Sequence, residues 1–321
     1  MKYLVVTGGA GFIGANIVKT LNELGEERIL VIDNLNTSEK WKNLVDLSFD
    51  DYVHKNKFIE KLKEGKYENS IKAIIHLGAR SSTTEKDVDF LMENNYEYTK
   101  TLALWAVERD IRFIYASSAA TYGDGSYGFS DDHSLIQKLR PLNAYGYSKQ
   151  IFDVWALKNK LIDKIVGLKY FNVYGPREWH KGDMRSMVLK AYESIKKEGK
   201  IRLFKSYNPK YKDGEQLRDF IYVKDAVQMT LFFLDKPHIN GIFNVGTGIP
   251  RSWNDLARAV FSALNLKPNI EYIDMPEVLR GKYQYFTKAQ MEKIKLAGYE
   301  LSTLSLEEGV KDYVLNHLEA K

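Results

Sequence analysis

The 321-residue sequence contains no cysteine. This excludes a disulfide framework, a catalytic thiolate and a metal site built on cysteine ligands, and we expect no metal. No apolar run approaches the roughly twenty residues that cross a bilayer, so we expect no membrane partner. The first predicted strand begins at Lys2, so we expect no signal peptide and a cytoplasmic protein. The formal net charge of +5 is mild and spread out, which favours a small anionic ligand over nucleic acid.

A glycine-rich segment lies near the start of the chain. The apolar run Tyr3–Val6 has the length of a strand, Thr7-Gly-Gly-Ala-Gly-Phe-Ile-Gly14 follows at once, and helical apolar spacing continues to Leu24. Gly8 allows a tight turn, Gly11 lets the backbone approach a pyrophosphate closely, and Gly14 permits close packing of the helix on the strand. The helix N-terminus offers free N–H groups to an anion, so the segment predicts nucleotide binding rather than an ordinary turn.

A second strand, Ile29–Asp33, ends in an acid about twenty residues further on, where a ribose hydroxyl needs an acceptor. A free Asp33 carboxylate repels a 2′-phosphate and favours NAD. Asn34 and Lys40 follow, however, and a nearby cation neutralises such a phosphate, to which Lys55 adds a second charge. Either lysine could instead be a solvated surface charge, so the residues alone leave NADP and NAD open.

Strands and helices alternate along the first half of the chain. Further strands are predicted at 73–77, 112–116 and 164–170, and further helices at 58–63, 94–108 and 145–157. This alternation predicts an α/β fold with a doubly wound parallel sheet of the Rossmann type, whose ligands bind at the carboxyl ends of the strands.

The second half has shorter, mixed elements. We expect Asp219–Tyr222, a helix at 223–234 and a strand at 242–245 to return to the first sheet. The expected organisation is therefore a nucleotide-binding domain of residues 1–172 with 219–245. The remaining residues, 173–218 with 246–321, form a smaller mixed α/β substrate-binding domain.

Three side chains in the first half are suited to moving a proton. Ser118 follows the strand at 112–116, and Tyr145 and Lys149 lie one helical turn apart on one face of the next helix. A phenol with its usual pKa near 10 is a weak base at neutral pH, but an adjacent ammonium favours the phenolate. A lone Tyr-x-x-x-Lys is readily a surface pair. Behind a nucleotide turn and a Ser-Ser segment, it predicts oxidation of an alcohol carbon.

Several longer segments carry a resemblance over nearly the whole chain. They are Ser81–Glu85, Met92–Tyr96, Tyr115–Gly123, Pro141–Lys149, Tyr170–Glu178 and His180–Gly182. The chain resembles the extended short-chain dehydrogenase/reductase family, and this set of segments is similar to the ADP-glyceromanno-heptose 6-epimerases within it. The turn and the Tyr-x-x-x-Lys pair alone are common to the whole superfamily.

The resemblance implies an epimerase that inverts C6 of the heptose in ADP-D-glycero-D-manno-heptose, by transient oxidation and re-reduction, for the inner core of lipopolysaccharide. It implies NADP rather than NAD, self-association into a homo-oligomer, and Lys181 as a second acid/base. Other cofactor contacts are implied at Phe12, Ile13, Leu77, Gly78, Ala79, Arg80, Ser81, Asn94 and Val173. Substrate contacts are implied at Asn172, Asp183, Lys190, Phe204, Lys205, Ser206, Tyr207, Arg218 and Tyr283.

Two substrate positions depart from the family pattern. Asp183 stands where the family usually has Ser, and Lys190 where it often has His. Arg218 suits a diphosphate because its guanidinium matches phosphate oxygens in a bidentate way, although a salt bridge with Asp219 or Asp225 is an equal alternative.

Two other functions stay open. One is another sugar-nucleotide enzyme, such as a UDP-hexose 4-epimerase. The 4,6-dehydratases are less attractive because Ala119-Ala-Thr121 occupies the stretch where they carry a Thr-Asp-Glu group. The other is a nucleotide-sensing protein without chemistry, but pure binding requires none of the proton-transfer groups at Ser118, Tyr145, Lys149 and Lys181.

Overall fold

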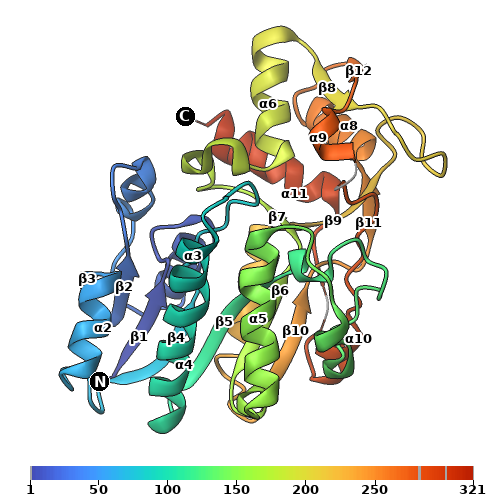
Figure 1. The fold of residues 1–321 in the computed structure, drawn as a ribbon. Coiled ribbons are helices and arrows are strands. Elements are labelled where there is room, and N and C mark those ends of the chain that lie inside the picture. The colour runs from blue at the N-terminus through green and yellow to red at the C-terminus, as the bar shows by residue number, and fades with distance from the viewer. Residues whose placement is uncertain (1, 281–282, 301, 321) are drawn as a thin grey trace.

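The computed structural model describes residues 2–280, 283–300 and 302–320. Over this range the largest unit is a seven-stranded sheet in the order β10-β6-β5-β4-β1-β2-β3, with every neighbouring pair parallel (Figure 1). Its strands are β1 (Tyr3–Thr7), β2 (Ile29–Asp33), β3 (Asp51–His54), β4 (Ile71–His76), β5 (Arg112–Ser118), β6 (Val166–Tyr170) and β10 (Gly241–Val245). The predicted doubly wound parallel sheet is confirmed. The edge strand β3 is an addition to the prediction.

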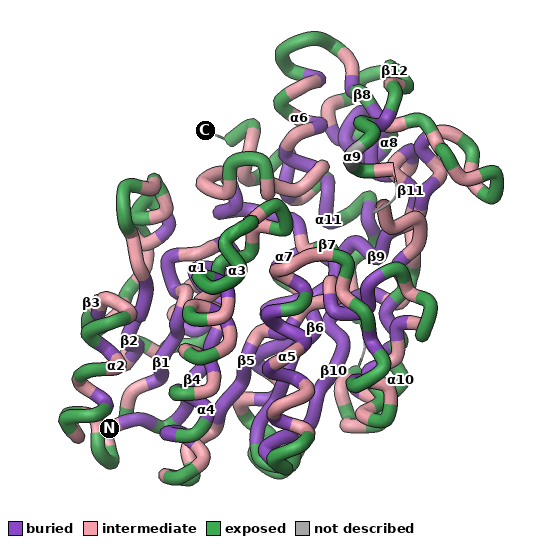
Figure 2. The backbone as a smooth tube through the Cα atoms, in the orientation of Figure 1, coloured by how far each residue is buried: buried purple, intermediate pink, exposed green. Residues whose placement is uncertain are grey.

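Helices cover both faces of this sheet. One face carries α2 (Lys55–Lys63), α3 (Val88–Leu91), α4 (Tyr98–Glu108) and α5 (Ala144–Lys158), and the other carries α1 (Phe12–Glu23) and α7 (Val223–Phe232). Alternate strand residues pack into separate cores: Leu4 and Val6 lie with α1 and α7, while Val5 lies with α2, α4 and α5. The strands are therefore buried on both sides (Figure 2).

The helix predicted from Asn94 is interrupted. A π-helical turn, η2 (Met92–Glu97), lies between α3 and α4. Such a turn accommodates one more residue than an α-helical turn and is frequent at functional sites. Here it carries Asn94 and Asn95 beside the carboxyl ends of the strands.

The segment after Arg218 corrects one expectation. β9 (Leu217–Tyr222) does not join the large sheet. It lies in a three-stranded sheet between β7 (Asn172–Tyr174) and β11 (Pro250–Ser252). The buried Asp219 carboxylate fixes this position by accepting backbone N–H groups from Thr247, Gly248 and Ala289 at 2.8–2.9 Å. The predicted strand at 242–245 does return to the large sheet as β10.

The remaining elements complete the chain. β8 (Ile201–Phe204) and β12 (Ile270–Ile273) form a parallel pair. With α6 (Met187–Glu198), α8 (Trp253–Ala263), α9 (Glu277–Arg280) and α11 (Leu306–Tyr313) they lie beyond the carboxyl ends of the large sheet, whereas α10 (Glu292–Leu296) lies beside β10 (Figure 1). Short turns are η1 (Glu39–Leu44), η3 (Ala119–Tyr122), η4 (His133–Lys138), η5 (Leu161–Asp163), η6 (Trp179–Met184) and η7 (Val314–Leu318). None of the described helices combines the length and apolar character needed to span a membrane.

Candidate active site

A cavity of about 920 Å³ opens between the carboxyl ends of the parallel strands and the elements that lie beyond them, such as η6, α6 and α8. All four predicted catalytic residues line it: Ser118, Tyr145, Lys149 and Lys181. Every predicted cofactor residue also lines it: Gly8, Gly11, Phe12, Ile13, Gly14, Asp33, Asn34, Lys40, Lys55, Leu77, Gly78, Ala79, Arg80, Ser81, Asn94 and Val173. The fold therefore brings together residues as far apart in the chain as Gly8 and Lys181.

The glycine turn leaves room for a ligand and none for side chains. Gly8 has φ +69°, and a Cβ there would lie 2.7 Å from the Gly78 nitrogen. A Cβ at Gly14 would overlap the carbonyl oxygen of Gly8. No side chain caps the N-terminus of α1. A close backbone approach and free helix N–H groups fit the pyrophosphate of a dinucleotide.

Asp33 at the end of β2 is buried and already holds a cation. Its Oδ2 accepts the Ala10 N–H at 2.9 Å, and its Oδ1 accepts the Asn34 N–H at 2.7 Å and the Lys40 ammonium at 2.5 Å. Lys55 donates to the Asn94 side chain, and burial lowers the pKa of Lys55. The carboxylate can accept from a ribose, while Lys40 supplies a positive charge beside it.

Ser118, Tyr145 and Lys149 form one wall of the cavity. Ser118 ends β5 and caps η3 by accepting the Ala120 N–H at 3.1 Å. Tyr145 and Lys149 lie on the first turns of α5. Burial raises the pKa of Tyr145, and a hydrogen bond with Ser118 opposes that rise. Burial lowers the pKa of Lys149 to about 8, and the charge of Asp153 opposes this fall.

Lys181 lines the cavity from η6, beside the start of α1. Its Nζ lies 5.2 Å from the centroid of the Phe12 ring, at the start of α1. Burial lowers the pKa of Lys181, and the neighbouring Glu178 carboxylate opposes this. The buried Glu178 also accepts the Ser186 N–H at 2.5 Å and its hydroxyl at 2.6 Å. One carboxylate thus closes the loop that carries Lys181.

The predicted substrate residues divide into two groups. Asn172 and Asp183 line the cavity, and Lys190 outside it donates to the Asp183 carbonyl oxygen at 2.7 Å. The segment 204–207, Arg218 and Tyr283 are not among the lining residues. Within that segment, Lys205 and Tyr207 engage the Asp274 carboxylate at the surface.

Arg218 adjoins the cavity through aromatic rings. Its guanidinium lies 5.5 Å from the Trp253 ring, which lines the cavity, and 5.1 Å from the Tyr283 ring. It donates to the Leu217 carbonyl oxygen at 2.9 Å, and burial lowers its pKa. The alternative salt bridge with Asp219 or Asp225 is wrong, since neither of these described carboxylates pairs with it.

Some lining residues were not predicted. They include Thr7, His180, Phe220, Trp253, Gln284 and Thr287. Gln284 donates to the Gly123 carbonyl oxygen at 2.6 Å, and so joins the late chain to the segment after Ser118. Trp253 had a sequence signal: it follows Ser252 in a capping box completed by Asp255, which marks the start of a helix.

The sheet, the glycine turn and the Ser-Tyr-Lys wall define a nucleotide-dependent oxidoreductase-type site, and the chain matches the NAD dependent epimerase/dehydratase family over residues 4–246. The chain belongs to this family. It is 56% identical over 316 residues, 98% of either chain, to an ADP-L-glycero-D-manno-heptose-6-epimerase of Nitratidesulfovibrio vulgaris (strain DP4). It is 50% identical over 324 residues, again 98% of either chain, to the enzyme of that name from Fusobacterium nucleatum.

Solved structures are similar to the whole chain. The Helicobacter pylori ADP-L-glycero-D-manno-heptose-6-epimerase matches with a TM-score of 0.85 and 30% identity, covering 100% of this chain and 97% of the other. The UDP-glucose 4-epimerase of Thermus thermophilus, solved with NAD, matches with a TM-score of 0.75 and 25% identity over 97% of each chain.

Proposed function

We propose that the chain is an ADP-L-glycero-D-manno-heptose 6-epimerase that interconverts the two C6 epimers of the sugar nucleotide and supplies lipopolysaccharide synthesis. The observation that carries the proposal is that two separate sets of proton-transfer groups line one cavity. Tyr145 lines it with Ser118 and Lys149, and Lys181 lines it beside Phe12. Inversion requires a carbonyl to be reached in two orientations, so two such groups suit it.

Tyr145 is the proposed base for the first wall. Its phenolic oxygen takes the proton of the hydroxyl group on the reacting carbon, and it returns a proton when the alcohol is re-formed in that same orientation. The Lys149 ammonium favours the phenolate, and the Ser118 hydroxyl donates a hydrogen bond to the reacting oxygen. A bound nicotinamide supplies the hydride acceptor and donor, held by the glycine turn and by Asp33. No net oxidation results.

Lys181 is the proposed acid/base for the other orientation. Its lowered pKa eases loss of the proton, and Glu178 keeps the residue in its loop. Arg218, most of whose donors have no partner among the described residues, is proposed for the substrate diphosphate. Residues 173–218 and 246–321 are proposed as the substrate-binding part.

NADP is the proposed cofactor. The Lys40 ammonium, beside Asn34 and paired with Asp33, offers a positive charge to a 2′-phosphate. To test this choice, any bound nucleotide is removed from the purified protein, and the affinity of the protein for NADP and for NAD is then measured by titration. Retention of NAD alone, with no binding or turnover at excess NADP, contradicts this choice.

The reaction is tested by incubating the protein with ADP-D-glycero-D-manno-heptose and following C6 by NMR. We expect inversion without net reduction of the cofactor. Unchanged heptose with inversion at C4 of a UDP-hexose would instead favour the 4-epimerase function. Binding of nucleotide without any turnover would favour the sensing function.

A further inference from the structure

A fully buried carboxylate lies behind the catalytic wall. Asp153 is on α5, one helical turn after Lys149, and has no exposed surface. It accepts hydrogen bonds from the Tyr115 hydroxyl at 2.8 Å and the Ser117 hydroxyl at 2.7 Å, both on β5. The helix that carries Tyr145 is thereby tied to the strand that ends in Ser118.

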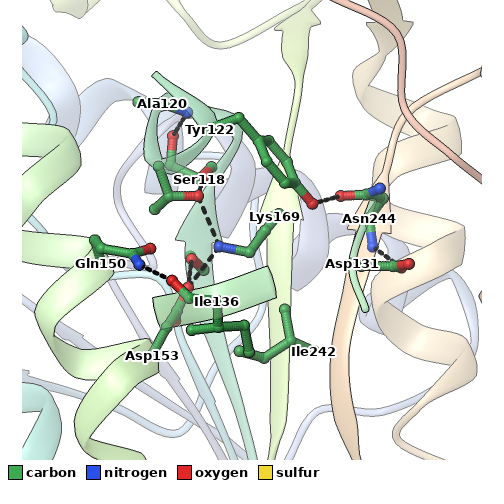
Figure 3. A network of polar contacts seen from close by, with 12 residues as sticks. Ser118, Ala120, Tyr122, Asp131, Ile136, Gln150, Asp153, Lys169, Ile242 and Asn244 are labelled. Atoms are coloured by element: carbon green, nitrogen blue, oxygen red, sulfur yellow. Dashed lines mark hydrogen bonds and ion pairs between the residues drawn. The ribbon is translucent and has the colours of Figure 1, made fainter. Parts of the chain in front are cut away.

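A buried lysine completes this cluster. Lys169 on β6 donates to Asp153 Oδ2 at 2.6 Å and to Thr121 Oγ1 at 2.6 Å (Figure 3). Thr121 in turn donates to the carbonyl oxygen of Ser118 at 2.8 Å. Lys169 thus links the segment after Ser118 to the Asp153 carboxylate of α5. A buried ion pair is weak evidence of a stabilising role, because desolvation offsets much of its attraction.

We propose that Asp153, held in place by Lys169, is a positioning residue that fixes the Tyr145–Lys149 turn against Ser118 and places a carboxylate one helical turn from Lys149. The inference rests on the proposed function only in taking Lys149 to serve Tyr145. The arrangement itself consists of the Asp153 carboxylate, paired with Lys169 and one helical turn from Lys149, and its effect on Lys149 can be tested without substrate.

Groups from several elements face Lys149. Its own helix contributes the phenol of Tyr145 and the carboxylate of Asp153. From β4 comes His76, whose pKa burial lowers to about 3, so that it carries no charge at working pH. Lys169 on β6 pairs with Asp153 and so offsets part of the charge that this carboxylate presents to Lys149. Asp153 is therefore the anion that keeps Lys149 protonated, and Lys169 limits its effect.

This arrangement predicts opposite effects from the two partners. Asp153→Asn removes the anion, so Lys149 is expected to lose its proton about one pH unit lower than in the wild type. Lys169→Met leaves the carboxylate with neutral donors only, so Lys149 is expected to keep its proton to higher pH. Lys169→Arg retains the cation and is expected to leave the titration unchanged.

The readout is competitive labelling of the free protein. A trace of amine-reactive reagent is applied across a pH series, and labelling of Lys149 is measured by peptide mass spectrometry. The wild-type midpoint is expected near pH 8. The alkaline limb of kcat/KM for epimerisation is expected to move with it in each variant. Failure of the wild type to turn over ADP-heptose would overturn the proposed function and leave the labelling result intact.

The double variant Asp153→Asn/Lys169→Met guards against misfolding, because it removes both members of the buried Asp153–Lys169 ion pair together. It is expected to fold and to show a Lys149 midpoint below that of the wild type. The proposal is overturned if Asp153→Asn and the double variant titrate like the wild type. It is also overturned if Asp153→Asn and Lys169→Met shift Lys149 in the same direction.

Discussion

The cofactor half and the substrate half of the cavity differ in how their polar groups are satisfied. Beside the cofactor half, the buried Asn95 side chain makes four hydrogen bonds. Two join it to the N–H and the carbonyl oxygen of Arg80, and the other two join it to the side chains of Asn94 and Ser148. Beside the substrate half, the buried Arg218 has, among the described residues, one carbonyl partner and two aromatic rings. The Asn95 side chain therefore has its hydrogen bonds made within the protein, whereas Arg218 keeps donors that no described group uses.

This contrast separates two kinds of buried polar group. A side chain whose hydrogen bonds are all made within the protein holds the site in shape, since leaving any of them unmade is costly. A side chain with unused donors retains binding capacity for a ligand. Substitutions of the first kind should therefore disturb the shape of the site, and substitutions of the second kind should weaken ligand binding.

The junction of the two halves should be the most sensitive position. Tyr145→Phe removes one hydroxyl with little change in shape, and we expect kcat to fall by roughly 10³-fold, as is typical for loss of a general base. Cofactor affinity should be unchanged, measured by titration of fluorescence. Normal turnover in this variant would contradict the role of the phenol.

The cofactor half should lose affinity for the cofactor when the backbone of its glycine turn is displaced. In Gly14→Ala the new Cβ overlaps the Gly8 carbonyl, and we expect cofactor affinity to fall by roughly 100-fold, about 2.7 kcal/mol. The control is Gly199→Ala, where φ is +67° and the space is open. It should lose about 1 kcal/mol of unfolding free energy and keep cofactor affinity. Equal cofactor loss in both variants would count against the turn.

The substrate half should lose affinity without losing shape. Arg218→Ala removes donors that the protein itself hardly uses, so we expect KM for the sugar nucleotide to rise about 30-fold, or ~2 kcal/mol. Cofactor affinity should not change. The matched variant Arg218→Lys keeps the charge but not the planar fork, and it should recover only part of the loss. An unchanged KM in Arg218→Ala would place the diphosphate elsewhere.

The smallest effect should concern cofactor choice. Lys40→Ala removes the cation paired with Asp33, and we expect NADP affinity to fall by about tenfold while NAD affinity stays the same or improves. Parallel titrations with both cofactors provide the measurement. Lys42→Ala is the control, because Lys42 pairs with Glu39 at the surface. Equal losses for both cofactors would show that Lys40 does not discriminate between them.

Local patterns predicted the local structures. β1, the glycine turn and α1 were found because the spacing, the turn residues and the helix start agree along one continuous segment. β3 was missed because Asp51–His54 is a four-residue edge strand with one buried residue, which gives almost no periodic signal. The partners of β9 depend on Asp219 reaching distant backbone groups, and no local pattern encodes that.

The residues of the candidate site were likewise predicted where a local motif carries them, and missed where only the tertiary fold brings them together. Motifs located the cofactor-lining residues and the Ser118, Tyr145 and Lys149 group, because the strands that carry or precede these motifs end at the same edge of the sheet. Asp153 and Lys169 were not found, since an isolated acid on a helix and an isolated lysine in a strand usually indicate solvated positions. Only the meeting of β5, α5 and β6 reveals them as a buried pair.

The π-helical turn Met92–Glu97 makes this site sensitive to the deletion of a single residue. Deleting one residue there would restore ordinary helical winding and leave the chain nearly as long. Because the wider turn absorbs its additional residue locally, the flanking helices α3 and α4 would keep nearly their present register, and only the residues of the turn itself would move. Asn94 and Asn95 would then face new neighbours, and Lys55, Arg80 and Ser148 would lose their amide partners together. A single in-frame codon loss would thus disable the pocket while sparing the architecture.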